Sequence, residues 1–312
     1  MSDKMDSIYN YHFWRHRIPL GNNTYTPGVR HEDQWNDLHF PEDLKGMSFL
    51  DAGANDGMYS FIAESKGAGD IVATDIYHDD KHNWEMTNGW PNYGILTAKN
   101  YLGSKVEVHS LSVYDLDKLN RKFDYVFCGN VIIWLNDPYG AHVKLASLAN
   151  KVLHLREDMI VGEGPAQMRF SKLWKPGSAI PLFAANKTYY REVFKAAGFT
   201  SVEFYEVDED RQWREFVTRC PKVSLMANTN TYLLPRDTSP MGMLNEAKTG
   251  RISERVNGKA YIVGIGWVAE SDCTMIKEDL SAPSLFQRMK KALKRWREGE
   301  NREANMAIIA RR

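Results

Sequence analysis

The sequence predicts an α/β fold built on a mostly parallel sheet with helices on both faces. From Met47 onward, short apolar runs alternate with helical stretches, as they do in chains made of βαβ units. Within the first such unit, the segment FLDAGANDGMYSF (Phe49–Phe61) joins an apolar run ending in an acid to an apolar helix start through two glycines. These two observations favour a doubly wound sheet with a ligand-binding turn after its first strand.

Short apolar runs predict the strands of this sheet, because buried parallel strands are apolar on both faces. In chain order these runs are Ser48–Ala52, Asp70–Thr74, Val106–Ser110, Phe123–Cys128, Met159–Glu163 and Ser201–Glu206. Amphipathic segments between them predict helices. These segments are Met58–Lys66, Gly94–Leu102, Ala141–Leu153 and Thr188–Phe199. Gly198 near the end of the last one is a natural C-terminal cap.

The two ends of the chain differ from this core. Residues 1–45 are polar and aromatic-rich, with turn signals at Leu20–Gly28 and Phe40–Gly46, and they predict a cap or lid. Residues 46–207 form the predicted Rossmann-like domain. Residues 208–312 form a C-terminal extension that includes the last sheet strand and a substrate or oligomer element. In that extension residues 208–258 look rich in loops, and three elements follow: a strand at Ala260–Ala269, a helix at Leu285–Arg297 and a closing strand at Asn305–Arg312.

Composition narrows the class of protein. The formal net charge is zero, so no global charge draws this chain toward nucleic acid or membrane. The three cysteines, at positions 128, 220 and 273, are far apart and lack metal-ligand spacing, which indicates a reducing compartment and predicts no metal site. Residues 1–14 lack the apolar region of a signal peptide, and the longest apolar stretch is too short to cross a bilayer. We therefore expect a cytoplasmic protein that does not act at a membrane.

The turn after the first strand carries the pattern D-x-G-x-x-x-G, formed by Asp51, Gly53 and Gly57. A dinucleotide-binding turn requires G-x-G-x-x-G, and here Asn55 and Met58 replace its second and third glycines. A P-loop is excluded because no Lys-Ser/Thr pair follows the glycine. Glycines alone are also typical of a tight strand-to-helix turn, so the neighbouring strands must decide between the two interpretations.

Two further features support a nucleoside site. The second strand ends in Asp75, about 20 residues beyond the turn, where a carboxylate can accept both ribose hydroxyls of an adenosine. The third strand is followed by Leu111–Leu116, whose small and apolar residues suit the flanks of an adenine ring. Asp51 beside the turn suits a cationic amino-acid group better than a phosphate. Three such sites in this order are more specific than one.

The string LDAGANDGMYSF…IVATD…VYDL…FDYVFCGNVIIWLNDP resembles the class I S-adenosylmethionine-dependent methyltransferases. The preceding FWRHRIPLGNNTYTPG is similar to the N-terminal segment of the subgroup that includes the tRNA wobble-uridine carboxymethyltransferase. The resemblance covers roughly residues 10–207. It implies a seven-stranded Rossmann-like sheet. The residues alone leave open whether Ala260–Val268 or Met306–Ala310 closes this sheet beside the sixth strand, and the resemblance makes the last one the reversed edge partner. It also implies transfer of a one-carbon group from S-adenosylmethionine.

The resemblance also implies the residues that bind this cofactor. The turn after the first strand would wrap the methionine portion, the acid ending the second strand would bind the ribose, and residues after the third strand would flank the adenine. The asparagine after the fourth strand would sit beside the sulfonium. The implied set is Asp51, Gly53, Asn55, Gly57, Asp75, Ile76, Ser112, Val113 and Asn130.

One departure from the subgroup bears on the cofactor. Where the subgroup carries an HLRDP-like stretch, this chain has IWLNDP, with Trp134 for the histidine and Asn136 for the arginine. A carboxylated S-adenosylmethionine needs a cationic or strongly donating group beside its extra carboxylate. The loss of the arginine therefore favours ordinary S-adenosylmethionine and methyl transfer. Arg15 or Arg17 could replace it, which keeps the carboxylated cofactor as the alternative.

Transfer from a sulfonium needs mainly an acceptor held in line with the methyl group. A hydroxyl or protonated amine acceptor also needs a base, and the candidates are His12 and His16 in the cap segment. The alternative is that both are surface histidines of a terminal segment. Their geometry decides which interpretation holds.

Aromatic residues in the cap, after the fourth strand and after the fifth strand are candidates for acceptor binding, with plain core packing as the alternative. Glu163, at the end of the predicted fifth strand, is a further candidate because ligands approach open sheets at that edge. The substrate candidates are Trp14, Trp134, Glu163 and Tyr189. The same regions also carry Tyr25 and Trp174.

The acceptor class stays open between three functions. A small-molecule oxygen or nitrogen is favoured. Transfer to tRNA is the alternative, because the predicted helix Leu285–Arg297 intersperses six cations with an apolar face, although neutral overall charge favours a packed helix with a solvated cationic face. A catalytically silent methyltransferase fold that binds the cofactor or a partner is the third possibility, and the intact turn and Asp75 argue only against loss of the cofactor site. The oligomeric state does not follow from the sequence.

Overall fold

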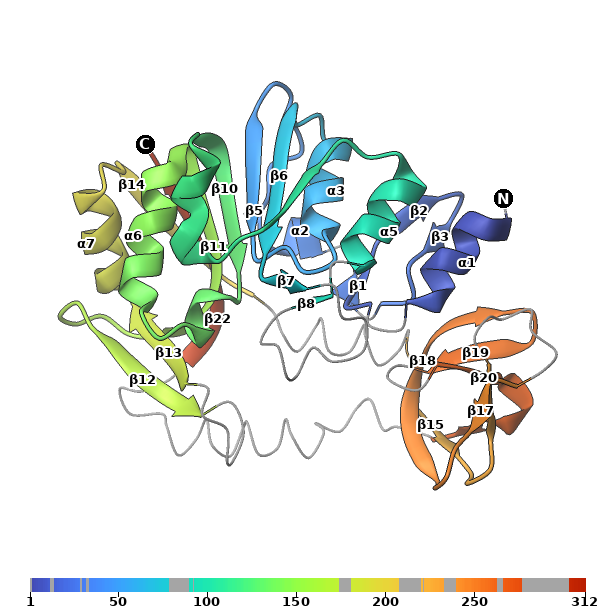
Figure 1. The fold of residues 1–312 in the computed structure, drawn as a ribbon. Helices are drawn as coiled ribbons and strands as arrows, with labels where there is room; N and C mark the ends of the chain where they lie inside the picture. Colours follow the sequence, from blue (N-terminus) through green and yellow to red (C-terminus); the bar gives the residue numbers. More distant parts are fainter. Residues whose placement is uncertain are drawn as a thin grey trace. The chain divides into compact units, whose positions relative to one another are not determined.

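The computed structural model of the chain has a mixed α/β fold (Figure 1). It describes residues 2–11, 14–28, 30–31, 34–78, 90–91, 93–173, 181–207, 220, 222–232, 240–262, 266–276 and 303–312. The chain forms two compact units. Unit 1 comprises residues 1–34, 92–104 and 208–282, and unit 2 comprises residues 35–91, 105–207 and 283–312. Each unit draws residues from more than one of the three segments expected from the sequence, and that segmentation itself stays a prediction.

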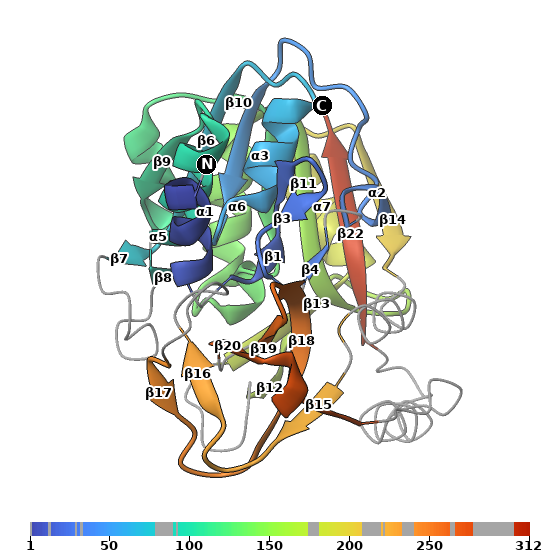
Figure 2. The same ribbon diagram turned by 90° about the vertical axis from the view of Figure 1, so that its right-hand side faces the viewer.

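Unit 2 contains a central sheet of seven main strands in the order β14-β22-β11-β10-β5-β6-β9. Their bounds are β5 Ser48–Ala52, β6 Asp70–Asp75, β9 Glu107–Ser110, β10 Phe123–Gly129, β11 Ala149–Ile160, β14 Ser201–Glu206 and β22 Glu303–Arg311. The strands from β11 to β9 pair in parallel, whereas β22 is antiparallel to both of its neighbours (Figure 2). The predicted fold class is confirmed, including the reversed last strand. The expected edge position of that strand was wrong: β22 pairs with β11 on one side and with β14 on the other, so β14 forms the edge.

A β-hairpin extends this sheet beyond the carboxyl end of β10. The last residue of β10, Gly129, is in register with Arg156 of β11, and β13 (Pro181–Asn186) pairs in parallel with Met159 and Ile160 further along β11. β22 pairs with Met159 and Ile160 along one edge of β11, so β13 pairs along the opposite edge. That is the edge with which β10 pairs nearer the start of β11. β12 (Met168–Leu173) completes the hairpin in antiparallel register. The hairpin therefore stands in line with β10, past its end.

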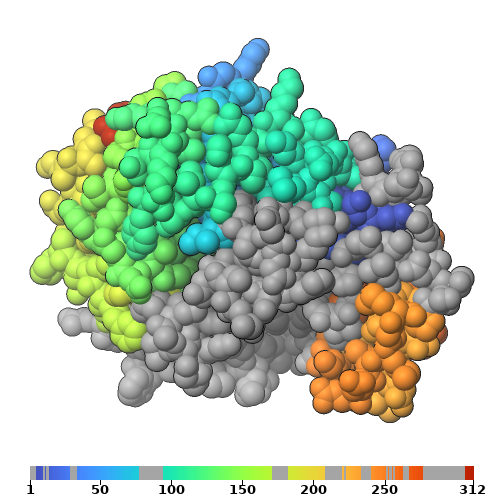
Figure 3. Space-filling view, viewed as in Figure 1, coloured from blue at the N-terminus to red at the C-terminus, as the bar shows by residue number. Residues whose placement is uncertain are grey.

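Two apolar layers cover the sheet of unit 2. On one face, Phe40 packs against Phe127 and His154 of the sheet and against Tyr59 of α3 (Met58–Ser65). On the other face, Val126, Leu155 and neighbouring side chains form the main core with the helices that follow β9, β10 and β13. Those helices are η1 Val113–Leu119, α6 Pro138–Leu148 and α7 Lys187–Ala196. From η1 to α7 these residues form one continuous surface in the space-filling view (Figure 3).

The boundary between α6 and β11 differs from the prediction. Residues 149–153 were expected to be helical and 159–163 to be the fifth strand, but the strand begins at Ala149 and ends at Ile160. Ala149 is in register with Phe123 of β10, and Val152 with Tyr125. Pairing with β10 overrides the helical propensity of these residues, because a buried strand position gains more from the ladder than from local preference.

Unit 1 contains a seven-stranded antiparallel sheet in the order β17-β16-β20-β19-β18-β15-β21. Its strands are β15 Lys222–Leu225, β16 Asn230–Tyr232, β17 Gly242–Met243, β18 Lys248–Val256, β19 Lys259–Ile262, β20 Gly266–Ala269 and β21 Thr274–Met275. The expectation of a loop-rich region over 208–258 was therefore wrong for most of the residues described there. The single strand expected at 260–269 is two paired strands. The small core of this sheet, centred on Val223 and Ile252, is built from alternating residues far apart in the chain. Such a pattern is too weak to recognise from local sequence.

The remaining elements of unit 1 are short. They are α1 Ser2–Asn10, β1 His16–Arg17, β2 Pro19–Gly21, β3 Thr24–Tyr25, β4 Arg30–His31 and α5 Tyr93–Leu102. Asn22 and Asn23, both with positive φ, connect β2 to β3 in the predicted turn. The elements still unnamed are α2 Gln34–Asp37, β7 Tyr77–His78, β8 Trp90–Pro91, η2 Ile132–Trp134 and η3 Glu270–Asp272. None of the helices described is long and apolar enough to cross a membrane. The predicted helix 285–297 lies outside the described residues.

Candidate functional site

The turn between β5 and α3 has a backbone that only particular residues can adopt. Gly53 has φ +84° and Gly57 has φ +85°, and Asn55 between them has φ +54°. A Cβ on Gly53 would lie 2.2 Å from Cγ2 of Val131, so a larger residue fits neither the conformation nor the space. The Gly53 and Ala54 N–H groups donate to the Thr74 carbonyl oxygen over 2.7 and 2.9 Å. The turn is thereby fastened to the carboxyl end of β6.

Asp75, the last residue of β6, is oriented by backbone donors. Its Oδ2 accepts the Asn55 N–H at 2.9 Å, and its Oδ1 accepts the Ile76 N–H at 2.8 Å. The carboxylate therefore stands directly beside the Gly53–Gly57 turn, as a ribose-binding acid would. Ile76 after it is 46% exposed, so its side chain is open to a ligand.

Asp51 is a buried carboxyl group whose hydrogen bonding is incomplete. Ser60 Oγ of α3 donates to its Oδ2 at 2.7 Å, whereas its Oδ1 has no hydrogen-bond partner within the described part of the chain. The pKa of Asp51 is raised to about 7: burial raises it most, the negative charges of Asp75 and Asp56 add to this, and the Ser60 hydrogen bond opposes them. A cation placed at Oδ1 would relieve both the missing bond and the repulsion.

Three carboxyl groups thus lie around one turn: Asp51, Asp56 and Asp75. Asp51 and Asp56 are almost fully buried. A pyrophosphate brought to this turn would meet like charge without a compensating lysine or arginine from the turn itself, which carries neither. A ligand with an ammonium group and a ribose fits the same groups. The donor set therefore suits a cationic nucleoside.

The segment after β9 follows on from Asp75. The Leu111 N–H donates to the Asp75 carbonyl oxygen at 2.9 Å, which holds residues 111–113 next to the end of β6. Ser112 caps η1 through its Oγ, which accepts the Tyr114 N–H at 3.3 Å, and Val113 is buried. These residues lie where the sequence placed the adenine contacts.

The turn after β10 closes the set. Asn130 has φ +56°, and its N–H donates to the Arg156 carbonyl oxygen at 2.7 Å, so β10 and β11 stay paired up to this point. The indole Nε1 of Trp134 donates to the Asn130 carbonyl oxygen at 2.7 Å, which fastens the half-buried ring of Trp134 to the turn. Val131 next to Asn130 is the residue that approaches Gly53. The structure therefore brings the predicted cofactor residues together at the carboxyl edge of β5, β6, β9 and β10.

The other predicted residues lie in different environments. Glu163 is three residues beyond the end of β11, exposed, and forms an ion pair with Arg191 at 3.3 Å. Tyr189 is buried in α7, and its hydroxyl is 3.0 Å from Nδ1 of His142. Trp14 and His16 are buried in unit 1, where the Trp14 indole donates to the Ile8 carbonyl oxygen. His12 lies outside the described residues. The roles of these residues in catalysis or substrate binding stay predictions.

Sequence reasoning missed four polar side chains near this edge: Asp56, Ser60, His142 and Glu157. Ser60 could have been found from its place one helical turn into α3, on the side that faces the strand. His142 and Glu157 belong to different elements, and no local pattern links them. The residues that the structure describes contain no group of three or more His, Cys, Asp or Glu side chains that could hold a metal ion.

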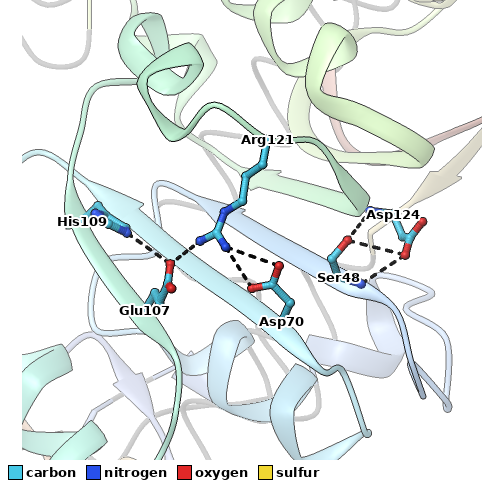
Figure 4. A network of polar contacts seen from close by, with 6 residues as sticks. All are labelled: Ser48, Asp70, Glu107, His109, Arg121 and Asp124. Carbon is cyan, nitrogen blue, oxygen red and sulfur yellow. Dashed lines mark hydrogen bonds and ion pairs between the residues drawn. The ribbon is translucent and has the colours of Figure 1, made fainter.

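The opposite, amino-terminal end of the same strands has a contrasting arrangement (Figure 4). Arg121 pairs with Asp70 at 3.3 Å and with Glu107, and Glu107 also contacts His109. At the start of β5 and β10, Asp124 Oδ2 accepts the Ser48 N–H at 3.2 Å. Here each carboxylate has a cation or a donor. At the carboxyl edge, by contrast, Asp51 Oδ1 has no hydrogen-bond partner among the described residues.

Comparisons with known proteins show no matching family model and no matching curated protein. Among solved structures, the magnesium protoporphyrin IX methyltransferase of Synechocystis PCC 6803, with bound S-adenosylmethionine, is 19% identical, and the match covers 53% of this chain and 65% of that one with a TM-score of 0.37. The match thus spans slightly less than two thirds of that enzyme.

Two further solved structures are similar in the same weak sense. The 1,6-didemethyltoxoflavin-N1-methyltransferase of Burkholderia thailandensis is 16% identical, with 54% and 67% of the two chains covered and a TM-score of 0.40. The cyclase SpnF is 13% identical, with 70% and 77% covered and a TM-score of 0.44. A shared fold does not establish a shared activity. The function proposed below therefore rests on the residues of this chain.

Proposed function

We propose that this protein is an S-adenosylmethionine-dependent methyltransferase that acts on an oxygen or nitrogen of a small-molecule acceptor. The observation that carries the proposal is the group of carboxyls around the Gly53–Gly57 turn, in which Asp51 is buried, has its pKa raised to about 7 and keeps one oxygen without a hydrogen bond in the described structure. A nucleoside that carries an ammonium and a sulfonium complements this site electrostatically, whereas a dinucleotide does not.

Each part of the cofactor has a residue suited to it. Asp51 would accept the ammonium group of the methionine portion, and the Gly53–Gly57 turn would let the backbone approach it closely. Asp75 would accept the ribose hydroxyls, and Ser112 with Val113 would flank the adenine. When bound, S-adenosylmethionine supplies an activated methyl group. The chain's own task is then to hold an acceptor in line with that group beyond Asn130 and to exclude water.

The carboxylated cofactor fits this site less well. Its extra carboxylate would enter a region that already holds the negative charges of Asp51, Asp56 and Asp75. Ordinary S-adenosylmethionine is therefore the cofactor that we propose, and the assignment to the carboxymethyltransferase subgroup is not part of the proposal.

Calorimetric titration tests the proposal. S-adenosylmethionine, its demethylated product, the carboxylated cofactor and NAD are titrated into the wild-type protein, Asp75→Asn and Asp70→Asn. Asp70 begins the same strand that Asp75 ends, but it is exposed and pairs with Arg121, so it is a matched control. We expect micromolar binding of S-adenosylmethionine and weaker binding of the other ligands. Asp75→Asn should weaken it at least about tenfold, because two charge-assisted hydrogen bonds to the ribose are lost.

The outcomes separate the alternatives. Tightest binding of the carboxylated cofactor would replace methyl transfer by carboxymethyl transfer. Binding of none of the nucleosides by a folded protein would refute the proposal and favour a silent fold. Equal loss of binding in Asp75→Asn and Asp70→Asn would show that the effect is one of net charge, and the ribose contact would be wrong.

A further inference from the structure

A second group of buried polar side chains lies on the α6–α7 side of the sheet of unit 2. Glu157 of β11 and His142 of α6 are at most 2% exposed, and Nε2 of His142 lies 3.2 and 3.1 Å from the two carboxylate oxygens. The Tyr190 hydroxyl donates to Glu157, and the Tyr189 hydroxyl is 3.0 Å from Nδ1 of His142. Four polar groups are therefore connected by hydrogen bonds in an apolar core, where an unpaired polar group would be costly.

This cluster lies at the catalytic edge of the sheet. Glu157 follows Arg156, the residue in register with the last residue of β10, so it stands just past the carboxyl end of that strand. Two elements, η2 and β13, also lie past this end of β10 and contact each other. Trp134 belongs to η2. Asn130 begins the turn that leads into η2. The cluster is thus directly behind the segment that the proposed function places beside the transferred methyl group.

A small cavity adjoins the cluster. His142, Glu157 and Tyr190 supply its polar wall, and apolar residues of η2, α6, β12 and β13, including Ile133 and Ala184, supply the rest. Its volume of about 10 Å³ is at the lower limit of what holds one water molecule. A water there would have a carboxylate and a phenol as partners. The cavity lies between the Glu157 carboxylate and the residues of η2.

Both tyrosines of the cluster keep their hydroxyl protons, because burial, reinforced by Glu157, raises the pKa of Tyr190 and of Tyr189 above the ordinary phenol value. The Tyr190 hydroxyl donates to Glu157. The Tyr189 hydroxyl can donate to Nδ1 of His142 or accept from it. A base requires the first of these arrangements, in which the ring proton lies on Nε2 and faces the Glu157 carboxylate.

We propose that the His142–Glu157 pair is the base that takes the proton of the methyl acceptor, through the cavity below η2. This inference rests on the proposed function. In the step, the O–H or N–H bond of the acceptor breaks, its electron pair stays on the oxygen or nitrogen, and the proton passes to a Glu157 oxygen, directly or through one water. The pair then becomes imidazolium and carboxylate, without net charge, which suits a dry core.

The surroundings of the pair support a proton acceptor. Cys128 of β10, Asp137 before α6 and Tyr139 in α6 interact electrostatically with Glu157 or Tyr189, and Asp158 of β11 interacts with Tyr190. The negative charges of Asp137 and Asp158 favour a group that takes up a proton. His16, the other described histidine proposed as a base, belongs to unit 1. We therefore place the base in the core of unit 2 and not in the N-terminal segment.

The first test measures protonation and needs no acceptor. Nitrogen NMR of ¹⁵N-histidine-labelled protein, with His142 assigned by loss of its signals in His142→Gln, reports how many ring protons it carries with and without bound S-adenosylhomocysteine. At about pH 7.5 we expect a neutral His142 with its proton on Nε2, and loss of that Nε2 preference in Tyr189→Phe. A doubly protonated His142 at this pH would overturn the proposal, because the pair would already hold the proton that it is meant to accept.

The second test measures turnover on those acceptors that the wild-type protein methylates in a panel of phenols and primary amines. Glu157→Gln should keep S-adenosylmethionine affinity within threefold and lower kcat at least about a hundredfold, the usual size of a lost general base. Its residual rate should rise steeply with pH as the acceptor ionises by itself. Lys144→Ala, at a partly exposed position on α6 whose ammonium pairs with Asp117, is the control and should match wild type.

The two proposals fail in different ways. Retained cofactor binding with unchanged kcat in Glu157→Gln would overturn the inference and leave the proposed function standing. No cofactor binding by the wild-type protein would overturn the proposed function, while the NMR result would still decide the protonation of the pair. If Glu157→Gln does not fold, Tyr189→Phe replaces it. A kcat for that variant equal to wild type, with an unchanged His142 spectrum, would equally refute the inference.

Discussion

Gly53→Ala provides a sharp test of the proposed cofactor turn. Two separate costs apply. An alanine at φ +84° costs about 1–2 kcal/mol relative to glycine, because a Cβ is disfavoured in the left-handed region. Its Cβ would also lie 2.2 Å from Cγ2 of Val131, a clash that adds the roughly 1–3 kcal/mol of an overpacked core. We therefore expect the free energy of unfolding to fall by about 2–5 kcal/mol.

Gly46 supplies the matched control. It also belongs to unit 2 and has a positive φ of +73°, but a Cβ there would meet no atom within 4 Å. Gly46→Ala should show the conformational cost alone, about 1–2 kcal/mol. Urea unfolding of both variants at one temperature measures the difference, and calorimetry with S-adenosylmethionine measures the effect on binding. Gly53→Ala should lose binding and Gly46→Ala should keep it.

A double variant identifies the clash. Trimming the partner in Gly53→Ala/Val131→Ala removes the atom that the new Cβ would strike, so the two substitutions should cost less together than the sum of the single ones, by about 1 kcal/mol or more. The reasoning would be refuted by equal destabilisation of Gly53→Ala and Gly46→Ala. Strict additivity in the double variant would refute it as well.

Three further predictions concern charge. The pKa of Asp51 rises from 3.8 to about 7 on folding, so the folded state binds an extra proton in this range. The free energy of unfolding should therefore fall as pH rises between about 4 and 7, by at most about 4 kcal/mol. Urea titrations of Asp51→Asn should lack this slope. Burial lowers the pKa of His154 from 6.5 to about 3, so the free energy of unfolding should fall as pH drops below about 6.5, the opposite direction to Asp51. Urea unfolding of His154→Gln should lack this slope while keeping the wild-type m-value. Arg121→Ala should change the unfolding free energy by less than about 1 kcal/mol, because its ion pairs with Asp70 and Glu107 are exposed; a larger loss in thermal or urea unfolding would contradict this.

Local sequence was enough to place the half of the sheet that carries the proposed cofactor site. β5, its turn and α3 are encoded within about twenty consecutive residues, since an apolar strand, two positive-φ glycines and an apolar helix start leave few other conformations. The same holds for Asp75, because a carboxylate that ends the second parallel strand reaches the same edge as the turn after the first. The hairpin turn at Asn22 and Asn23 is likewise a matter of neighbouring residues.

The tertiary structure decided what depends on distant partners. Residues 149–153 look helical by themselves and become strand only because β10 provides a ladder for them. The place of β22 between β11 and β14 joins segments about 100 and 150 residues apart, and the small sheet of unit 1 is built from short strands whose pattern is weak. The His142–Glu157 pair has the same origin. Its residues carry no signal until a helix packs on a strand, because the fold alone brings the two side chains within hydrogen-bond distance.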